Sequence, residues 1–264
     1  MSKLRLDVLL FERGLAHSRE LAKSLIMSGN VFIEGDRATK PGVQVCADAS
    51  VEVRKGPQYV SRGGQKLEKA LSFFSVSPKD RVCIDCGAST GGFTDCLLKN
   101  DARLVYAIDV GYGQLAWTIR NDPRVIAMER TNIRNVTVDM LDFIPSLATI
   151  DVSFISLSIV LPIVFDLLTD DAQVLCLIKP QFEAGRELVG KKGVVRDPEI
   201  HKAVLDAFVV YAGQSGFFPQ GLTYSPLRGP EGNIEFLALI STQGSSVQID
   251  TKSVVREAHE QLQK

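Results

Sequence analysis

Two stretches with different hydrophobic patterns follow one another along the chain. In residues 3–55, leucines and isoleucine recur at helical spacing and predict two short helices, with Ser18 placed to cap the second helix and Gly29-Asn30 to end it. Val31–Ile33 and the alternating Val51–Val53 then predict short strands joined by tight turns. This part is therefore expected to be a small α+β domain.

From residue 81 onward, apolar segments alternate with stretches of helical pattern. Helices are expected to begin at Phe93 and Gln114 and to lie near Leu157–Leu168. The segments expected as strands are Val82–Asp85, Leu104–Asp109, Val125–Met128, Ala148–Asp151, Val174–Ile178 and Ile234–Ile240. Strands that alternate with helices are typical of the α/β class, and we expect a Rossmann-like, doubly wound parallel sheet.

The change of pattern divides the chain into three parts. Residues 1–58 are expected to form the small domain, residues 59–245 the sheet domain, and residues 246–264 a C-terminal tail or helix. Gly56–Val60 marks the linker, and Gly64–Phe74 has the pattern of an amphipathic helix that leads into the sheet.

The composition is that of an ordinary folded protein, and the net charge bears on whether the chain could bind nucleic acid. The chain has 264 residues, 45% hydrophobic and 23% charged, with a formal net charge of −1. Any affinity for nucleic acid must therefore come from a local patch. Residues 1–60 carry nine Lys and Arg against seven Asp and Glu, a net +2, whereas residues 61–264 carry 21 against 24, a net −3.

No apolar stretch is long enough to predict a membrane span. The longest, Ile159–Leu168, is broken by Pro162 and Asp166 and falls short of the roughly 20 residues required. Arg5 and Asp7 interrupt the place where a signal peptide would be apolar. Five cysteines without a framework spacing agree with reduced thiols, and we expect a cytoplasmic protein.

A small group of polar residues opens the second helix. His17-Ser18-Arg19 stands at the expected N-terminus and Lys23 follows one turn later. A helix N-terminus, a hydroxyl and two cations could converge there on an RNA phosphate. Each Lys or Arg taken singly is more simply a solvated surface charge, so the inference depends on the clustering.

A glycine-rich turn follows the first strand of the expected sheet. The segment Asp85–Thr94 reads DCGASTGGFT, and such turns bring the backbone close to a ligand. It lacks the Gly-Lys-Ser/Thr ending of a P-loop and the spacing G-x-G-x-x-G. Asp85 beside Gly87 suits an amino-acid ammonium group, and Asp109 could accept hydrogen bonds from a ribose diol. S-adenosylmethionine has both groups, although a purely structural turn stays an alternative.

Four charged residues are expected near this turn. Asp151 and Lys179 end neighbouring strands, Lys66 lies on the entering helix, and Glu235 begins the last strand. Methyl transfer to a ribose 2′-hydroxyl needs a base, and a lysine can serve if burial or a second cation lowers its pKa from about 10.4. We expect Lys66 to be the second cation that lowers the pKa of Lys179. Asp151 would orient the ammonium or the hydroxyl, and Glu235 would hold Lys66. Each residue alone could simply be solvated.

The cysteines and histidines predict no metal site. Cys83 and Cys86 form a C-x-x-C, but no second pair or nearby histidine completes a ligand set, and buried thiols are expected. His17, His201 and His259 are scattered and match no triad or zinc pattern.

Several motifs in order resemble the TlyA/hemolysin-A family, which joins an S4-type RNA-binding domain to an FtsJ-like RNA ribose 2′-O-methyltransferase domain. The resemblance covers nearly the whole chain. The matching strings are Arg5–Leu10, Gly14–Arg19, Lys40–Gly42, Tyr59–Leu67, Asp85–Thr94, Ile178–Phe182, Gly193–Pro198 and Gly232–Phe236. One departure is the linker, Gln58-Tyr59-Val60, where some relatives have an arginine and a tryptophan.

The resemblance implies roles for particular residues and a ribosomal RNA or ribosomal subunit as partner, with cytidine riboses as targets and a monomer favoured. The implied catalytic residues are Lys66, Asp151, Lys179 as the base, and Glu235. S-adenosylmethionine would be held by Asp85, Gly87, Ala88, Ser89, Thr90, Gly91, Gly92, Phe93, Asp109 and Asn132. RNA would be held by Arg5, His17, Ser18, Arg19, Lys23 and Lys40.

Two other functions stay open at this point. A membrane-lytic protein, as the family's older label suggests, would need an amphipathic helix or hairpin with a strong apolar face, and residues 252–264 are too polar to insert. The other is an RNA-binding protein with a non-methyltransferase Rossmann domain, which would be either a scaffold that has lost its activity or a nicotinamide oxidoreductase. The oxidoreductase would use Asp109 equally well. The lysine pair argues against it.

Overall fold

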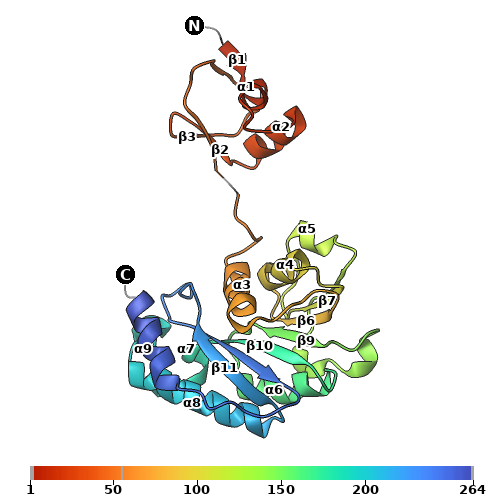
Figure 1. Ribbon diagram of the computed structural model, residues 1–264, viewed down its shortest axis with the longest axis vertical. Helices are drawn as coiled ribbons and strands as arrows, with labels where there is room; N and C mark the ends of the chain where they lie inside the picture. The colour runs from red at the N-terminus through yellow and green to blue at the C-terminus, as the bar shows by residue number, and fades with distance from the viewer. Residues whose placement is uncertain (1–2, 55, 263–264) are drawn as a thin grey trace. The chain divides into compact units, whose positions relative to one another are not determined.

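The computed structural model describes residues 3–54 and 56–262, and the chain forms two compact units, Met1–Gln58 and Tyr59–Lys264 (Figure 1). The domains expected from the sequence also include residues 1–2, 55 and 263–264. These positions lie outside the described residues. The division falls where the hydrophobic pattern of the sequence changes.

The first unit packs two helices against short strands. Helices α1 (Leu6–Glu12) and α2 (Arg19–Met27) lie where the sequence predicts them, and the Ser18 hydroxyl caps α2 by accepting a hydrogen bond from the Leu21 N–H at 3.1 Å. The strands are β1 (Lys3–Arg5) paired with β4 (Gln44–Cys46), and β2 (Val31–Ile33) between β3 (Asp36–Ala38) and β5 (Val51–Val53). Leu6, Leu10 and Ile26 are fully buried in the core.

The second unit is built on a seven-stranded sheet of order β11-β12-β10-β9-β6-β7-β8. Its strands are β6 (Val82–Cys86), β7 (Leu104–Ile108), β8 (Val125–Met128), β9 (Leu147–Ile150), β10 (Gln173–Ile178), β11 (Phe218–Tyr224) and β12 (Phe236–Ser241). The expected α/β class is confirmed. The sheet is not wholly parallel, because β12 runs antiparallel to both β10 and β11, and the sequence prediction missed β11.

Helices cover both faces of this sheet. The helices of this unit are α3 (Gly63–Phe74), α4 (Gly92–Lys99), α5 (Trp117–Arg120), α6 (Leu157–Asp166), α7 (Pro180–Glu183), α8 (Pro198–Gln214) and α9 (Thr251–Leu262). The unit also has the 3₁₀ turns η1 (Ile133–Asn135), η2 (Val138–Met140), η3 (Arg186–Leu188) and η4 (Lys191–Gly193). Buried side chains of α3, α4 and α5 form one core cluster, and those of α6, α8 and α9 form another. This is the doubly wound arrangement that the sequence predicts.

One expectation about helices needs correction. The helix expected from Gln114 begins at Trp117 and lasts four residues, because the chain before it is held as a loop in which the Gly113 N–H donates to Glu129 at 2.9 Å. Residues 246–264, expected as a tail or helix, carry α9, whose Val255 and Ala258 are buried in the core of the second unit.

The topology creates a crevice at one edge of the sheet. The chain leaves β6 toward β7 and β8 on one side, whereas β9 and β10 lie on the other. Ligands of such sheets bind beyond the carboxyl ends of the strands at this switch point. The glycine turn, Asp109, Asp151 and Lys179 all follow strand ends there.

Candidate active site and RNA-binding residues

The glycine turn between β6 and α4 is shaped by backbone conformations that suit glycine. Gly87 and Gly91 have φ of +90° and +92°, and a Cβ at Gly87 would collide with the backbone carbonyl of Asp151. The N–H groups of Gly87 and Ala88 both donate to the carbonyl of Ile108, at 2.9 and 3.0 Å. These contacts fasten the turn to the ends of β7 and β9.

Asp85 lies beneath the turn and is completely buried. Its Oδ2 accepts a hydrogen bond from the Thr94 hydroxyl at 2.6 Å, and its Oδ1 accepts one from Thr149 at 3.1 Å. Burial raises the pKa of the carboxyl to about 7 in spite of these bonds. Both oxygens therefore support the turn from below, whereas the sequence prediction had Asp85 facing a ligand's ammonium group.

A cavity of about 910 Å³ opens beside the turn, a volume within the range of small-molecule sites. Asp109 lines it, and the carboxylate accepts from the Ser89 N–H at 2.8 Å and from the Gly111 N–H at 2.6 Å. Of the residues predicted for the cofactor or for catalysis, the lining includes Gly87, Ser89, Asp109, Asn132 and Asp151.

Other predicted cofactor residues support this wall rather than forming it, and Asn132 both lines the cavity and has a structural role. Phe93 is buried in the α3–α4 core, and Thr90 accepts a hydrogen bond from the Ala116 N–H at 3.1 Å through its carbonyl. A Cβ at Gly92 would collide with the Ser61 hydroxyl, so α4 and the start of the second unit are in close contact. Asn132 caps η1, where its Oδ1 accepts from the Arg134 N–H at 3.1 Å.

The four charged residues predicted for catalysis form two ion pairs. Lys179 Nζ lies 2.6 Å from Asp151 Oδ1 and donates to the Ser153 hydroxyl at 2.9 Å. Lys66 Nζ lies 2.5 Å from Glu235 Oε2. All four side chains are largely buried, and Glu235 precedes β12 by one residue rather than beginning it.

The two pairs act on each other electrostatically. Burial raises the pKa of the Glu235 carboxyl, nearby Lys66 opposes that rise, and Asp151 and Lys179 also influence it. Each lysine is thus held by its own carboxylate, as the sequence predicts for Glu235 with Lys66 and for Asp151 with Lys179. Two cations balance two anions in a poorly hydrated region.

Phe154 is a functional candidate that the sequence reasoning missed. It lines the cavity, is 91% exposed, and has a φ of +64°, a conformation that a bulky residue rarely adopts. Its ring centroid lies 5.1 Å from that of Phe182, and Lys179 Nζ lies 5.9 Å from the Phe182 centroid. An aromatic surface therefore stands next to the Lys179–Asp151 pair.

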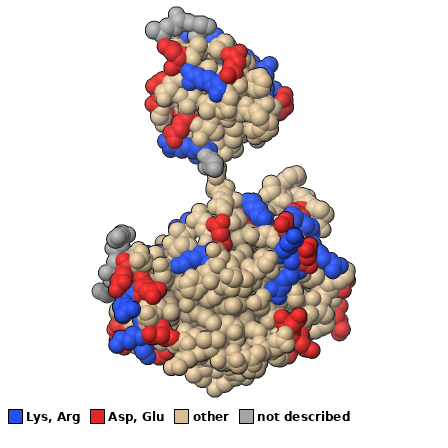
Figure 2. Space-filling model, in the orientation of Figure 1, with Lys and Arg blue, Asp and Glu red and all other residues tan. Residues whose placement is uncertain are grey.

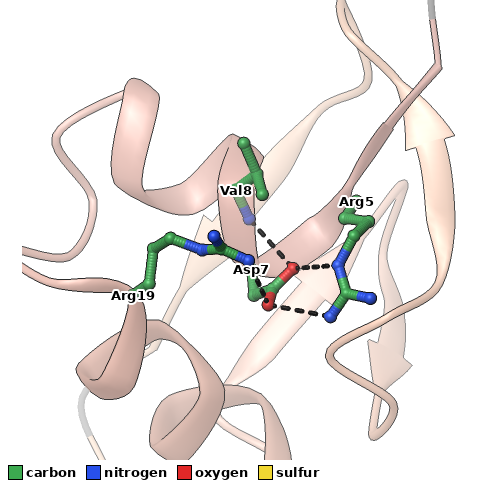
Figure 3. A network of polar contacts seen from close by, with 4 residues as sticks. All are labelled: Arg5, Asp7, Val8 and Arg19. Carbon is green, nitrogen blue, oxygen red and sulfur yellow. Dashed lines mark hydrogen bonds and ion pairs between the residues drawn. The ribbon is translucent and has the colours of Figure 1, made fainter.

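In the first unit, two predicted RNA-binding arginines share one buried carboxylate (Figure 3). Arg5 donates to both oxygens of Asp7 at 3.0 Å, and Arg19 donates to Oδ2 at 3.5 Å. The Val8 N–H adds a bond of 3.1 Å to Oδ1. Arg5 above all holds the pKa of Asp7 below its usual value, while both guanidinium groups stay about half exposed.

The remaining predicted RNA-binding residues lie around this pair. His17 and Lys40 are exposed, Lys23 is half-buried on α2, and the Ser18 hydroxyl is engaged in capping. Leu6 and Asp7 bond through their N–H groups to the carbonyls of Val43 and Pro41, which joins the segment of Lys40 to the start of α1.

Neither a metal cluster nor a membrane span was found in the described chain. Among residues 3–54 and 56–262, no three His, Cys, Asp or Glu side chains gather in a way that could hold a metal ion. Within those ranges no helix combines the length and the apolar character needed to cross a bilayer.

A doubly wound sheet with a glycine turn at its switch point and lysine–carboxylate pairs beside it defines a methyltransferase fold, joined here to a small basic unit. Residues 59–241 match the model of the FtsJ-like methyltransferase family, and residues 4–51 match the S4 domain. The chain belongs to the FtsJ-like methyltransferase family. It is therefore a methyltransferase whose cofactor is S-adenosylmethionine.

Relatives share both parts of the chain. It is 44% identical to the 16S/23S rRNA (cytidine-2′-O)-methyltransferase TlyA of Mycobacterium tuberculosis over 91% of each chain. It is 42% identical to Hemolysin A of Brachyspira hyodysenteriae, covering 89% of this chain and 98% of that one. A solved Streptococcus thermophilus structure, provisionally titled a hemolysin, is 47% identical with a TM-score of 0.76, covering 100% of this chain and 98% of that one.

Proposed function

We propose that this protein methylates the ribose 2′-hydroxyl of a cytidine in ribosomal RNA, with Lys179 as the base. The relative named as a cytidine-2′-O-methyltransferase supports the substrate. The observation that carries the chemistry is the largely buried Lys179–Asp151 pair, 2.6 Å apart, with Asp151 on the wall of the cavity. The working unit would be a monomer that acts on ribosomal RNA or a ribosomal subunit in the cytoplasm.

The cavity residues fit S-adenosylmethionine. Its sulfonium would supply an electrophilic methyl carbon. A carboxylate has about four acceptor positions, and Asp109 uses two of them for the N–H groups of Ser89 and Gly111. The remaining positions could accept hydrogen bonds from a ribose diol, while Gly87 leaves the adjoining wall free of a side chain.

Lys179 is placed to take a proton. Nζ lies 2.6 Å from Asp151 Oδ1 and donates a hydrogen bond to the Ser153 hydroxyl, and a lone pair on this nitrogen would accept the proton of a 2′-hydroxyl. Once the donor supplies its methyl group to the ribose oxygen, the proton of the hydroxyl would pass to Nζ. Asp151 would then stabilise the ammonium group so formed.

The second pair lies close enough to act on the same group of charges. Glu235 lies 2.5 Å from Lys66, and both Asp151 and Lys179 act electrostatically on the Glu235 carboxyl. Phe154 and Phe182 offer ring faces on which the target base could stack. The S4 unit would hold the RNA backbone through Arg5 and Arg19.

Substituting Lys179 tests the proposal. The Lys179→Ala variant should lose at least about a hundredfold in methylation rate of ribosomal RNA, since a general base contributes 10²–10⁴-fold. Its affinity for S-adenosylmethionine, measured by calorimetry, should stay within a few-fold of the parent. Mass spectrometry of digested RNA would locate the methyl group.

Lys252→Ala removes an exposed lysine on α9 and is the matched control, which should methylate normally. Lys179→Arg keeps a positive charge without a usable base and should be as inactive as Lys179→Ala. Normal activity of either Lys179 variant would exclude Lys179 as the base.

A further inference from the structure

A loop beside the cofactor cavity exposes large apolar side chains that methyl transfer itself does not require. Val110 is 69% exposed, Tyr112 67% and Trp117 77%. We call the two rings of Tyr112 and Trp117, together with the adjoining aliphatic Val110, the aromatic platform. They stand within eight residues of chain, from just after β7 to the first residue of α5. Scattered single exposures of this kind need no explanation, whereas a group does.

The loop that carries the aromatic platform is held rigidly at both ends. At its start, the Gly111 N–H donates to Asp109 at 2.6 Å and the Gly111 carbonyl accepts from Arg130 N–H at 2.9 Å. At its end, the Ala116 N–H donates to the Thr90 carbonyl at 3.1 Å. The exposed rings therefore belong to a fixed backbone, so ordering them on binding would cost little.

Glu129 fixes the middle of the loop and its charged neighbour. One carboxylate oxygen accepts from the Gly113 N–H at 2.9 Å and lies 2.5 Å from a guanidinium nitrogen of Arg120. Arg120 follows Trp117 by one turn of α5. The Arg130 guanidinium carbon lies 4.0 Å from the Tyr112 ring centroid.

The surroundings favour RNA as the occupant of the aromatic platform. Arg120 and Arg130 both lie at the platform, and Figure 2 shows uncharged surface over α5 with Lys and Arg side chains, and some Asp and Glu, beside it. Val110 also lines the cavity that holds the methyl donor, so the platform continues directly from the active site. Where aromatic rings lie next to arginines, the rings stack on unpaired bases and the arginines bind phosphates through their charge.

We infer that the aromatic platform is a second RNA subsite, on which Trp117 and Tyr112 stack unpaired bases that flank the target nucleotide. This inference rests on the proposed function, because it takes RNA to be the substrate. It adds contacts by the methyltransferase unit that are separate from those of the S4 unit. It also gives the loop after Asp109 a role besides shaping the cofactor site.

Trp117 allows a direct test, because it is the only tryptophan in the chain. Base stacking quenches tryptophan fluorescence, so titrating the full-length protein with ribosomal RNA, without donor, should quench the emission along the binding curve. The Trp117→Ala variant should bind this RNA about tenfold more weakly, and Trp117→Phe should bind nearly as well as the parent. Affinity for S-adenosylmethionine should be unchanged in both.

Phe73→Ala is the matched control, since Phe73 is an exposed aromatic residue on α3, outside the platform loop, and its loss should leave RNA affinity unchanged. RNA binding without quenching, together with normal affinity of Trp117→Ala, would overturn the subsite while leaving the methyltransferase proposal intact. A concentration-dependent dimer that Trp117→Ala abolishes would assign this surface to self-association and also overturn it. Failure of the parent protein to methylate RNA would instead refute the proposed function.

Discussion

At the scale of single residues, Asp7 shows how a buried carboxylate can organise two cations for a ligand. Its two oxygens hold Arg5 and Arg19, and both guanidinium groups keep N–H donors exposed to solvent. A phosphate bound by both arginines would meet donors already in position, which lowers the entropy lost on binding. Asp7 would thus act through the arginines and not touch RNA.

This arrangement predicts that substituting Asp7 changes RNA affinity in the direction opposite to the one that net charge alone predicts. Asp7→Asn removes a negative charge from an RNA-binding unit, so simple electrostatics predicts tighter binding. We expect binding about tenfold weaker, because the arginines lose a charged hydrogen-bond acceptor that fixes them. Filter binding of ribosomal RNA at several salt concentrations would measure it, at temperatures where circular dichroism shows both proteins folded.

Glu20→Gln is the control for this experiment, because it removes an exposed acid next to Arg19 on α2. That variant should bind RNA equally well or slightly more tightly. If Asp7→Asn were to bind more tightly as well, the carboxylate would have no positioning role.

The residues that end the strands could be predicted from the sequence, whereas the surroundings of individual side chains could not. Asp151, Lys179 and Asp109 each follow an apolar run, and parallel strands bring such residues to one edge. Asp85 lies beneath the turn because it accepts hydrogen bonds from the hydroxyls of Thr94 and Thr149. Thr149 is far away in sequence, so no local pattern indicates this bond. The exposure of Phe154 depends on a positive φ that no sequence pattern indicates.

At the scale of elements, helices α8 and α9 are joined by two histidines. Nδ1 of His201 lies 2.9 Å from Nε2 of His259, and His201 is fully buried, packed edge to face against Phe236. Its Nε2 has no hydrogen-bond partner among the described residues. Burial, reinforced by His259, lowers the pKa of His201 to about 4.

This pair predicts a loss of stability in mild acid. A histidine with a depressed pKa stabilises the fold fully above its unfolded pKa of about 6.5, and that contribution disappears as the pH falls toward 4, because only the unfolded chain takes up the proton. Urea unfolding should show roughly 2 kcal/mol less stability at pH 4.5 than at pH 7 from this source. His201→Gln should flatten the dependence, whereas His17→Gln, at an exposed site, should leave it as steep as in the parent.

Elements with strong periodicity were predicted and those without it were not. The apolar runs of β6, β7, β9 and β10 are buried strands inside the sheet and stand out in the sequence, and the edge strand β8 was predicted as well. Strand β11 contains Pro219 and Gly221 at a register shift, which disguises it as a turn. Helix α8 escaped notice although Pro198 opens it and Asp197 caps it.

At the scale of the whole molecule, the two units have separate hydrophobic cores. Leu6, Leu10 and Ile26 belong to one cluster, and the clusters on the two faces of the large sheet contain residues from Tyr59 onward. Tyr59 is buried in the second unit, and the neighbouring Val60 N–H donates to Asp95 on α4 at 2.8 Å. The large unit is therefore anchored from its first residues.

Separate cores predict separate unfolding of the two units in the intact chain. Scanning calorimetry should resolve two transitions, and S-adenosylmethionine at a hundred times its Kd should raise the midpoint of the larger transition by about 5 °C, because binding adds roughly 2.7 kcal/mol to a unit of this size. The smaller transition should not move, since the cofactor residues all lie beyond Gln58. Ribosomal RNA should raise the midpoint of the smaller one. A single transition that shifts as a whole with the cofactor alone would show that the units unfold together.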